Sequence, residues 1–164
     1  DNQLSDHFSA LTIETAFTDN LIGLQQALTQ SDIYGQTPLH AAARYNNNNP
    51  EVIRALITEL RQVFTGNQAG LQQALNQPDN HGWTPLHYAA MYNNNPEVIR
   101  ALLASLQQAF AGNLIGLQQA LTQDNDGSTP LRFATFNDNP EVRALLQAAI
   151  NQVEAAIDAQ QENQ

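Results

Sequence analysis

The sequence contains no cysteine among its 164 residues. It therefore forms no disulfide, and no thiolate can serve as a nucleophile or as a zinc ligand. No apolar stretch approaches the roughly 18 residues that a membrane-spanning helix needs, so no membrane span is expected. These absences leave the compartment open, because a soluble chain of this kind suits the cytoplasm as well as secretion into a host cell.

Lysine is also missing, and all six basic residues are arginines. Charged residues make up only 13% of the chain, well below the usual quarter, and asparagine and glutamine take their place. The 16 acidic residues bring the formal net charge to −10, without any cluster of basic residues. This balance argues against binding to nucleic acid or to an anionic membrane, and it favours a protein partner with a basic surface.

Three sequence blocks return with one shared period of about 46 residues. The blocks are Thr-Pro-Leu followed by His or Arg, then Asn-Pro-Glu-Val, and then Gly-Leu-Gln-Gln-Ala-Leu. The first block stands at 37–40, 84–87 and 129–132, the second at 49–52, 95–98 and 139–142, and the third at 23–28, 70–75 and 116–121. Independent landmarks that keep one period indicate an array of structural repeats.

Each block has a role in a helical repeat. A threonine caps a first helix that opens with proline, where the missing N–H costs nothing. Asn49 in the first copy caps a long amphipathic second helix, and Gly66 ends that helix in a left-handed conformation. Asn67 then caps a short third helix, and a turn through Gly35, or Gly82 in the next copy, leads to the following threonine. The pattern predicts an all-α repeat of three helices.

The repeat landmarks also divide the chain, residues 1–164, into parts of a single domain. Residues 1–31 are expected to be a partial repeat that caps the N-terminus, with residues 5–19 as the tail of a second helix. Residues 32–78 and 79–123 form two full repeats, and residues 124–164 form the C-terminal capping repeat. A helix from about Glu141 to Ala159 has one apolar side, and residues 160–164 are expected to fray.

The segments YGQTPLHAAARYNNNNPEVIRALI and DNHGWTPLHYAAMYNNNPEVIRALL resemble ankyrin repeats, and the bacterial style in particular. The resemblance covers Asp32–Leu60 and Asp79–Leu106, and more weakly Asp124–Leu146. An ankyrin repeat has about 33 residues, so this repeat is enlarged. The resemblance implies an α-solenoid that binds other proteins. Because an extra Gln-Gln helix replaces the usual loop, β-hairpin fingers are expected to be short or absent.

In ankyrin-like repeats, partner contacts come from the turn before Thr-Pro and from the exposed side of the first helix. Positions that differ between copies are free for a partner, and Trp83 is the foremost of these. Positions filled alike in all copies serve stacking, so Tyr45, Tyr92 and Phe136 are expected to pack between repeats, although Tyr92 also lies in a contact slot. The resemblance thus implies a partner-binding set of Ile33, Tyr34, Gln36, Arg44, His81, Trp83, Met91, Tyr92, Asp126 and Ser128.

No catalytic, cofactor-binding or metal site is expected. His40 and His87 stand three residues after a capping threonine, where hydrogen bonds between repeats explain them better than catalysis does. His81 has no acidic or histidine companion at ligand spacing. Residues 124–127 resemble the start of a calcium loop, but Thr135 stands where the loop needs glutamate. Glu51, Glu97 and Glu141 are interpreted as solvated helix-start residues, paired with arginine where one follows three residues later.

The sequence therefore favours a monomeric, non-catalytic protein-binding module. One refinement is a bacterial effector directed into a host cell, because a chain without lysine offers no site for ubiquitin. An alternative is a targeting or structural segment of a larger enzyme whose catalytic domain lies outside the chain. The start at Asp1 rather than at methionine is typical of a processed or excised chain.

Overall fold

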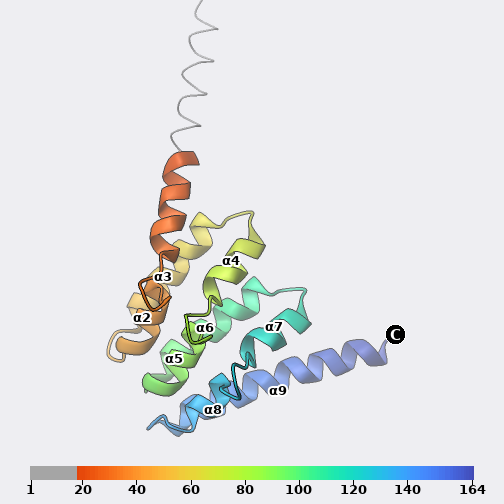
Figure 1. The fold of residues 1–164 in the computed structure, drawn as a ribbon. Helices are drawn as coiled ribbons and strands as arrows, with labels where there is room; N and C mark the ends of the chain where they lie inside the picture. Colours follow the sequence, from red (N-terminus) through yellow and green to blue (C-terminus); the bar gives the residue numbers. More distant parts are fainter. Residues whose placement is uncertain (1–17) are drawn as a thin grey trace, which may run out of the picture.

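The computed structural model describes residues 18–164, and every regular element in this part of the chain is a helix (Figure 1). A helix over residues 18–29 comes first. The others are α2 (Pro38–Tyr45), α3 (Pro50–Val63), α4 (Gln68–Leu75), α5 (Pro85–Tyr92), α6 (Pro96–Ala109), α7 (Leu114–Leu121), α8 (Pro130–Ala134) and α9 (Pro140–Glu162). The all-α class is confirmed, and residues 18–164 contain no β-hairpin finger.

The Asn-Pro-Glu segments start the second helices as the sequence predicts. Asn49 Oδ1 accepts a hydrogen bond from Glu51 N at 3.2 Å, and the caps at Asn95 and Asn139 have the same geometry. Proline follows each cap at the first helical position, where its lack of an N–H costs nothing. Gly66 has a φ of 78°, which is the left-handed conformation predicted for the end of α3.

The helices stack in layers. The first helices α2, α5 and α8 lie side by side, the second helices α3, α6 and α9 form the next layer, and the third helices α4 and α7 pack on α6 and α9 (Figure 1). Buried alanines such as Ala43 and Ala90 keep the first helices slim enough for close packing. In α3 the side chains of Ile53, Ile57 and Leu60 are buried. The equivalent positions of α6 are also buried, so one apolar core runs through the stack.

Amide side chains connect one repeat to the next. Asn93 Nδ2 donates to Ala43 O at 3.0 Å, and Asn137 makes the same contact one repeat later. Gln72, from the repeated Gly-Leu-Gln-Gln block, donates from Nε2 to Ala109 O at 2.8 Å. These carbonyls lie near helix ends, where the last turn leaves them without a partner inside the helix. The asparagine and glutamine content therefore serves stacking, a role that the sequence analysis did not predict.

Charged side chains run across the second helices as a ladder. Arg54 binds Glu51 in its own helix and also Glu97 of the next repeat, at 3.1 Å. Arg100 repeats the arrangement with Glu97 and with Glu141, the latter at 2.7 Å. The predicted pairs within one helix are present, and the structure extends them between repeats. Exposed pairs contribute little singly, about 0.2 to 1 kcal/mol each, so the ladder mainly favours one register of stacking.

Both ends of the stack lack the glycine that follows the second helix in the two full repeats. Asp19 stands where Gly66 and Gly112 stand, and it lies within the helix over residues 18–29. Ala156 takes the same place in the last copy, and α9 continues to Glu162, beyond the predicted end. A residue with a side chain adopts a positive φ reluctantly, so the helix goes on. Most of the helix tail predicted at residues 5–19 lies outside the described residues.

Candidate functional site

Each full repeat opens with a tight turn that an aspartate side chain holds closed. Asp32 Oδ1 accepts hydrogen bonds from Tyr34 N and Gln36 N, both at 2.9 Å. Asp79 Oδ1 binds the two equivalent N–H groups of the second turn at 2.9 and 3.0 Å. Gly35, with a φ of 79°, completes the turn as predicted, since glycine takes this conformation without strain. The side chain at the tip is left exposed.

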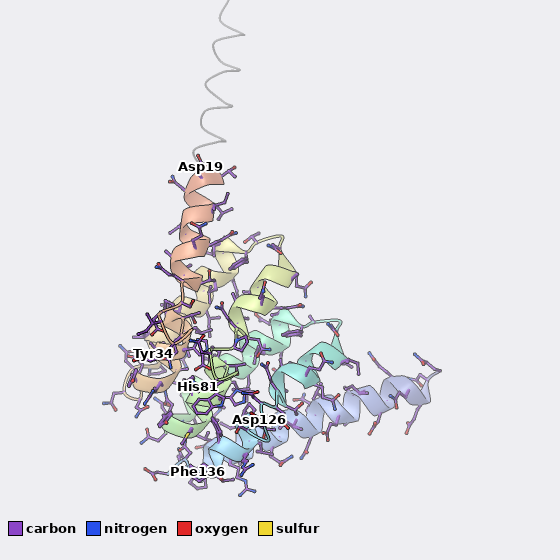
Figure 2. The ribbon with its side chains drawn as sticks, viewed as in Figure 1. Asp19, Tyr34, His81, Asp126 and Phe136 are labelled. Atoms are coloured by element: carbon purple, nitrogen blue, oxygen red, sulfur yellow. The ribbon has the colours of Figure 1, made fainter. Side chains whose placement is uncertain are left out.

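The turns of successive repeats are hydrogen-bonded to one another. Asn80 donates from its backbone N to Tyr34 O at 3.0 Å, and its Nδ2 donates to the neighbouring carbonyl of residue 33 at the same distance. One repeat later, Asn125 Nδ2 donates to His81 O, the counterpart of the Tyr34 carbonyl. Figure 2 shows Tyr34, His81 and Asp126 following one another along one side of the molecule. The turn tips therefore form a continuous row without any β-hairpin.

Two buried histidines join a first helix to the turn that precedes the next first helix. Thr37 N donates to His40 Nδ1 at 3.0 Å, so the ring proton lies on Nε2, which donates to Trp83 O at 3.0 Å. His87 repeats the arrangement, with Nε2 at 2.7 Å from Ser128 O. Burial lowers the pKa of both rings and keeps them neutral. The predicted role, hydrogen bonds that tie repeats together, is confirmed.

A buried carboxylate connects the second turn to α5. Tyr88 Oη donates to Asp79 Oδ2 at 2.5 Å and accepts from Gln36 Nε2 at 2.9 Å. Burial alone would raise the pKa of Asp79, but hydrogen bonds from Tyr88 and from the backbone of residues 81 and 83 hold it below its ordinary value. Burial, and then Asp79 itself, raise the pKa of Tyr88. Asp79 and Tyr88 thus satisfy each other's hydrogen-bonding groups, and the pair has a structural role.

The structure places five of the ten predicted partner-binding residues at the surface and five at intermediate depth. The exposed five are Ile33, Tyr34, His81, Tyr92 and Asp126. The half-buried five are Gln36, Arg44, Trp83, Met91 and Ser128. Three of the half-buried residues already form a hydrogen bond to another repeat, Gln36 through its side chain, and Trp83 and Ser128 through their carbonyls. The exposed residues and Arg44 are thus the better positioned to meet a partner.

Trp83 is less available to a partner than its position before Thr-Pro suggests. Its ring lies 5.0 Å from the ring centroid of Phe133 and 5.8 Å from that of Tyr88, both in edge-to-face geometry. His81 stacks on it at 5.2 Å. Such aromatic pairs contribute about 0.5 to 1.5 kcal/mol beyond simple burial. Part of Trp83 therefore holds the second repeat against the third.

The aromatic residues near the ends of the first helices require a correction. The prediction that all of them pack between repeats is wrong for Tyr45 and Phe136, which are 68% and 65% exposed. Tyr45 lies on the outer side of α2, which no described first helix covers. Phe136 follows the shortened α8, which already ends at Ala134. Tyr92 is 40% exposed and stacks on Tyr88, with ring centroids 6.2 Å apart.

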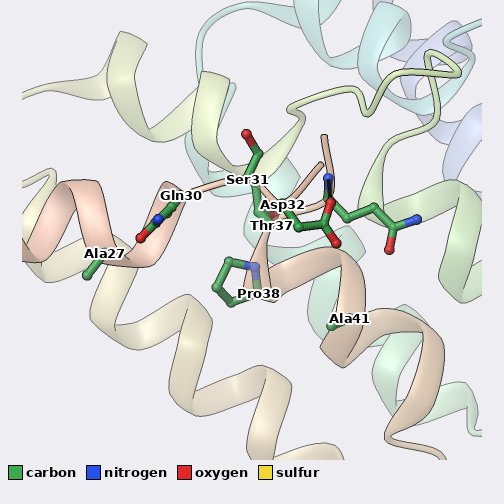
Figure 3. Close-up of a pocket in the computed structure, with 8 residues that line it drawn as sticks. Ala27, Gln30, Ser31, Asp32, Thr37, Pro38 and Ala41 are labelled. Atoms are coloured by element: carbon green, nitrogen blue, oxygen red, sulfur yellow. Dashed lines mark hydrogen bonds between the residues drawn. The ribbon is translucent and has the colours of Figure 1, made fainter. Parts of the chain in front are cut away.

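A groove of about 370 Å³ lies on the uncovered side of α2 (Figure 3). Its floor includes Pro38 and Ala41, which are both exposed. The equivalent residues of α5, Pro85 and Tyr88, are buried because α2 packs against that helix. Asp32 is the one titratable residue among those lining the groove, so it holds no acid–base pair. Among residues 18–164, the groove therefore lies at the end of the row of first helices.

Within residues 18–164, no group of three or more histidines and carboxylates is close enough together to hold a metal ion. No helix in this part of the chain combines the length and the apolar character needed to cross a membrane. The surface that stands out instead consists of the turn tips Tyr34, His81 and Asp126 and the helix-end aromatics Tyr45, Tyr92 and Phe136. We call these six positions the binding face.

The sequence was compared with known proteins. A family model described as ankyrin repeats, in three copies, matches residues 10–112, which is more than half of the chain. Among curated proteins, no relative matches the sequence. The matched range ends in the turn after α6, ahead of the third copy, where Arg132 replaces the histidine. With the helical stack and its Thr-Pro-Leu-His signatures, this match shows that the chain belongs to the ankyrin-repeat family.

Proposed function

We propose that the chain is a non-catalytic, monomeric scaffold that binds one protein partner across the binding face. Ankyrin repeats are generally protein–protein interaction modules. The hydrogen-bonded turns and the close-packed first helices hold the face rigid, so little conformational entropy is lost when a partner binds. The helices carry the stability, while the exposed tips remain free to contact the partner.

One observation carries this proposal. In all three copies the residue directly before the asparagine turn is aromatic, and these residues, Tyr45, Tyr92 and Phe136, are 68%, 40% and 65% exposed. Aromatic residues contribute a large share of the binding energy at protein interfaces. Exposed rings at the ends of successive first helices are typical of a surface that a partner covers.

Charge supports a partner with a basic or neutral surface. The carboxylates of Asp32, Asp124 and Asp126 are exposed in and beside the turns, whereas the equivalent Asp79 is buried. A negative surface attracts a basic partner over long range and repels an acidic one. The chain's net charge of −10 acts in the same direction.

Changing Tyr45 and Phe136 together to serine is expected to weaken partner binding at least tenfold, because two exposed rings leave the face while no core residue changes. The measurement is the affinity for peptides selected on the intact chain from a random phage-displayed library. Tenfold corresponds to about 1.4 kcal/mol, which is modest for two interface aromatics.

The matched control changes Leu24 and Ile115 to serine. These residues are 52% and 53% exposed but lie outside the binding face. The affinity of this double variant for the peptides is expected to stay within about twofold of that of the parent chain, since neither residue belongs to the binding face. Equal losses in both double variants would show that the peptides bind elsewhere.

The absence of lysine supports a finer proposal, that the chain acts inside a eukaryotic host cell as part of a bacterial effector. Lysines placed at the exposed positions Gln62, Gln73 and Gln119 are then expected to shorten its half-life in host cytosol several-fold, because ubiquitin gains acceptor sites. Arginine at the same three positions is the control for charge. An unchanged half-life of the lysine variant would overturn the effector proposal.

A further inference from the structure

The guanidinium of Arg44, near the end of α2, lies among three tyrosine rings. Its Cζ is 4.5 Å from the ring centroid of Tyr92, 5.0 Å from that of Tyr45 and 5.8 Å from that of Tyr88. Two of these rings belong to α5, so the next repeat holds the cation in place. Each such contact is stabilising, because the face of an aromatic ring attracts a cation. Arg44 is therefore ordered before any partner arrives.

The hydrogen-bonding capacity of this guanidinium is not used inside the described part of the chain. A guanidinium has five N–H donors and no acceptor. Arg54 and Arg100 each bind two carboxylates, and Arg132 binds a backbone carbonyl. Within residues 18–164, by contrast, no carboxylate or carbonyl lies within bonding distance of the Arg44 guanidinium. Its contacts are with aromatic rings, and its donors are left for an external acceptor.

Stacking of repeats does not explain the arginine. Met91 stands at the same position of the second repeat and Thr135 at that of the third. Both of those repeats are stacked without a cation there. The position is also half-buried between two exposed rings of the binding face, Tyr45 and Tyr92. This is the environment in which interface arginines contribute most to affinity.

We propose that Arg44 binds an aspartate or glutamate side chain of the partner, while Tyr45 and Tyr92 contact the residues that flank it. This inference rests on the proposed function of the binding face. A planar guanidinium matches a carboxylate with two parallel hydrogen bonds, and the aromatic contacts have already ordered the arginine side chain. The pair would be partly shielded from water by the two rings, which strengthens it.

The surrounding charge gives this contact a second consequence. The turns present Asp32 beside the binding face and Asp126 within it, so a carboxylate is repelled near these two turns. An acidic residue of the partner is then favoured opposite Arg44 and disfavoured beside the first and third turns. A single charge of opposite sign therefore sets the register in which a largely neutral or basic segment binds.

The test is a selection of random peptides, displayed as fusions whose C-terminus is joined to the phage coat and so offers no free carboxylate. The peptides are selected on the parent chain and, separately, on Arg44→Met. Methionine is the residue that the second repeat uses at this position, so the variant is expected to fold, which circular dichroism and thermal unfolding check. The parent pool is expected to hold aspartate or glutamate at one fixed position, and the variant pool is not.

Synthetic peptides with sequences from the parent pool then measure how strongly Arg44 and the acidic residue of the peptide depend on each other for binding. Changing the acidic residue of the peptide to its amide is expected to weaken binding to the parent chain about tenfold or more, with no further loss in Arg44→Met. Arg44→Lys is expected to recover only part of the affinity, because an ammonium lacks the planar pair of donors.

Two results separate failure of this inference from failure of the proposed function. In the first result, the peptides bind the variant lacking Tyr45 and Phe136 more weakly but carry no fixed acidic residue. This would overturn the Arg44 contact and would still support binding of a partner at the binding face. Peptides that bind every variant equally, or a selection that yields no binder at all, would overturn both.

Discussion

Replacing Tyr88 with alanine is expected to lower the free energy of unfolding by about 3 to 5 kcal/mol, the range for removing a large buried aromatic. Tyr88 is 3% exposed and lies between the first helices of two repeats. Its loss removes ring contacts to Trp83 and leaves a cavity. It also leaves Asp79 Oδ2 without the hydroxyl that it accepts from. In urea denaturation, the midpoint is expected to fall accordingly.

Tyr45→Ala is the matched control, because it makes the same chemical change at a residue that is 68% exposed. Its expected cost is below about 1 kcal/mol, mainly the lost contact with Arg44. Tyr88→Phe keeps the ring and removes only the hydroxyl, so it isolates the hydrogen bonds to Asp79 and Gln36, at about 1 to 3 kcal/mol. Equal midpoints for Tyr88→Ala and Tyr45→Ala would contradict the burial of Tyr88.

The sequence could predict the features that a short segment forms on its own, such as helix caps and turns. Asn49 accepts a hydrogen bond from a residue two positions away, and Gly66 adopts a positive φ because the chain must turn there. Such features depend on residue type and on a few neighbours, so one sequence suffices to identify them. Three copies of the asparagine cap and two of the helix-ending glycine then defined the repeat, its three helices and its all-α class.

What the sequence could not show was which atoms meet across the stack. The contact between Asn93 and Ala43 joins residues 50 positions apart and depends on the register of two helices. The cluster of Arg44 with Tyr88 and Tyr92 has the same origin. Comparison of copies identified Arg44 as a variable position, but the rings around it follow from packing alone.

The same limit explains the errors at the candidate site. A position that holds an aromatic ring in every copy fits stacking and partner binding equally well in a sequence. The exposures of Tyr45 and Phe136 decide between them. These exposures depend on the outer side of α2, which no described first helix covers, and on the shortened α8. Trp83 is the reverse case, since a position that varies between copies still packs against Phe133.

Lowering the pH from about 7.5 to about 5.5 is expected to destabilise the stack, through His40 and His87. Burial holds the pKa of both rings below 6.5, the value of the unfolded chain. Below pH 6.5 the unfolded state therefore binds more protons than the folded state, and falling pH favours unfolding. Protonation of Nδ1 would also set an N–H against the Thr37 N–H that it now accepts from. Stability is thus full above pH 6.5 and declines below it.

The nearby carboxylate of Asp79 does not titrate in this range. The pKa of Asp79 is lowered from 3.8, so its contribution to stability is lost only in stronger acid. The double variant His40→Gln and His87→Gln separates the two effects, because glutamine at this position can accept from the threonine N–H without titrating. Its unfolding midpoint in urea is expected to be lower than that of the parent at pH 7.5, since the bonds to Trp83 and Ser128 are lost. Between pH 7.5 and 5.5 it is expected to stay nearly constant, whereas the parent midpoint falls. Parallel declines in both proteins would assign the acid sensitivity to groups other than these two histidines.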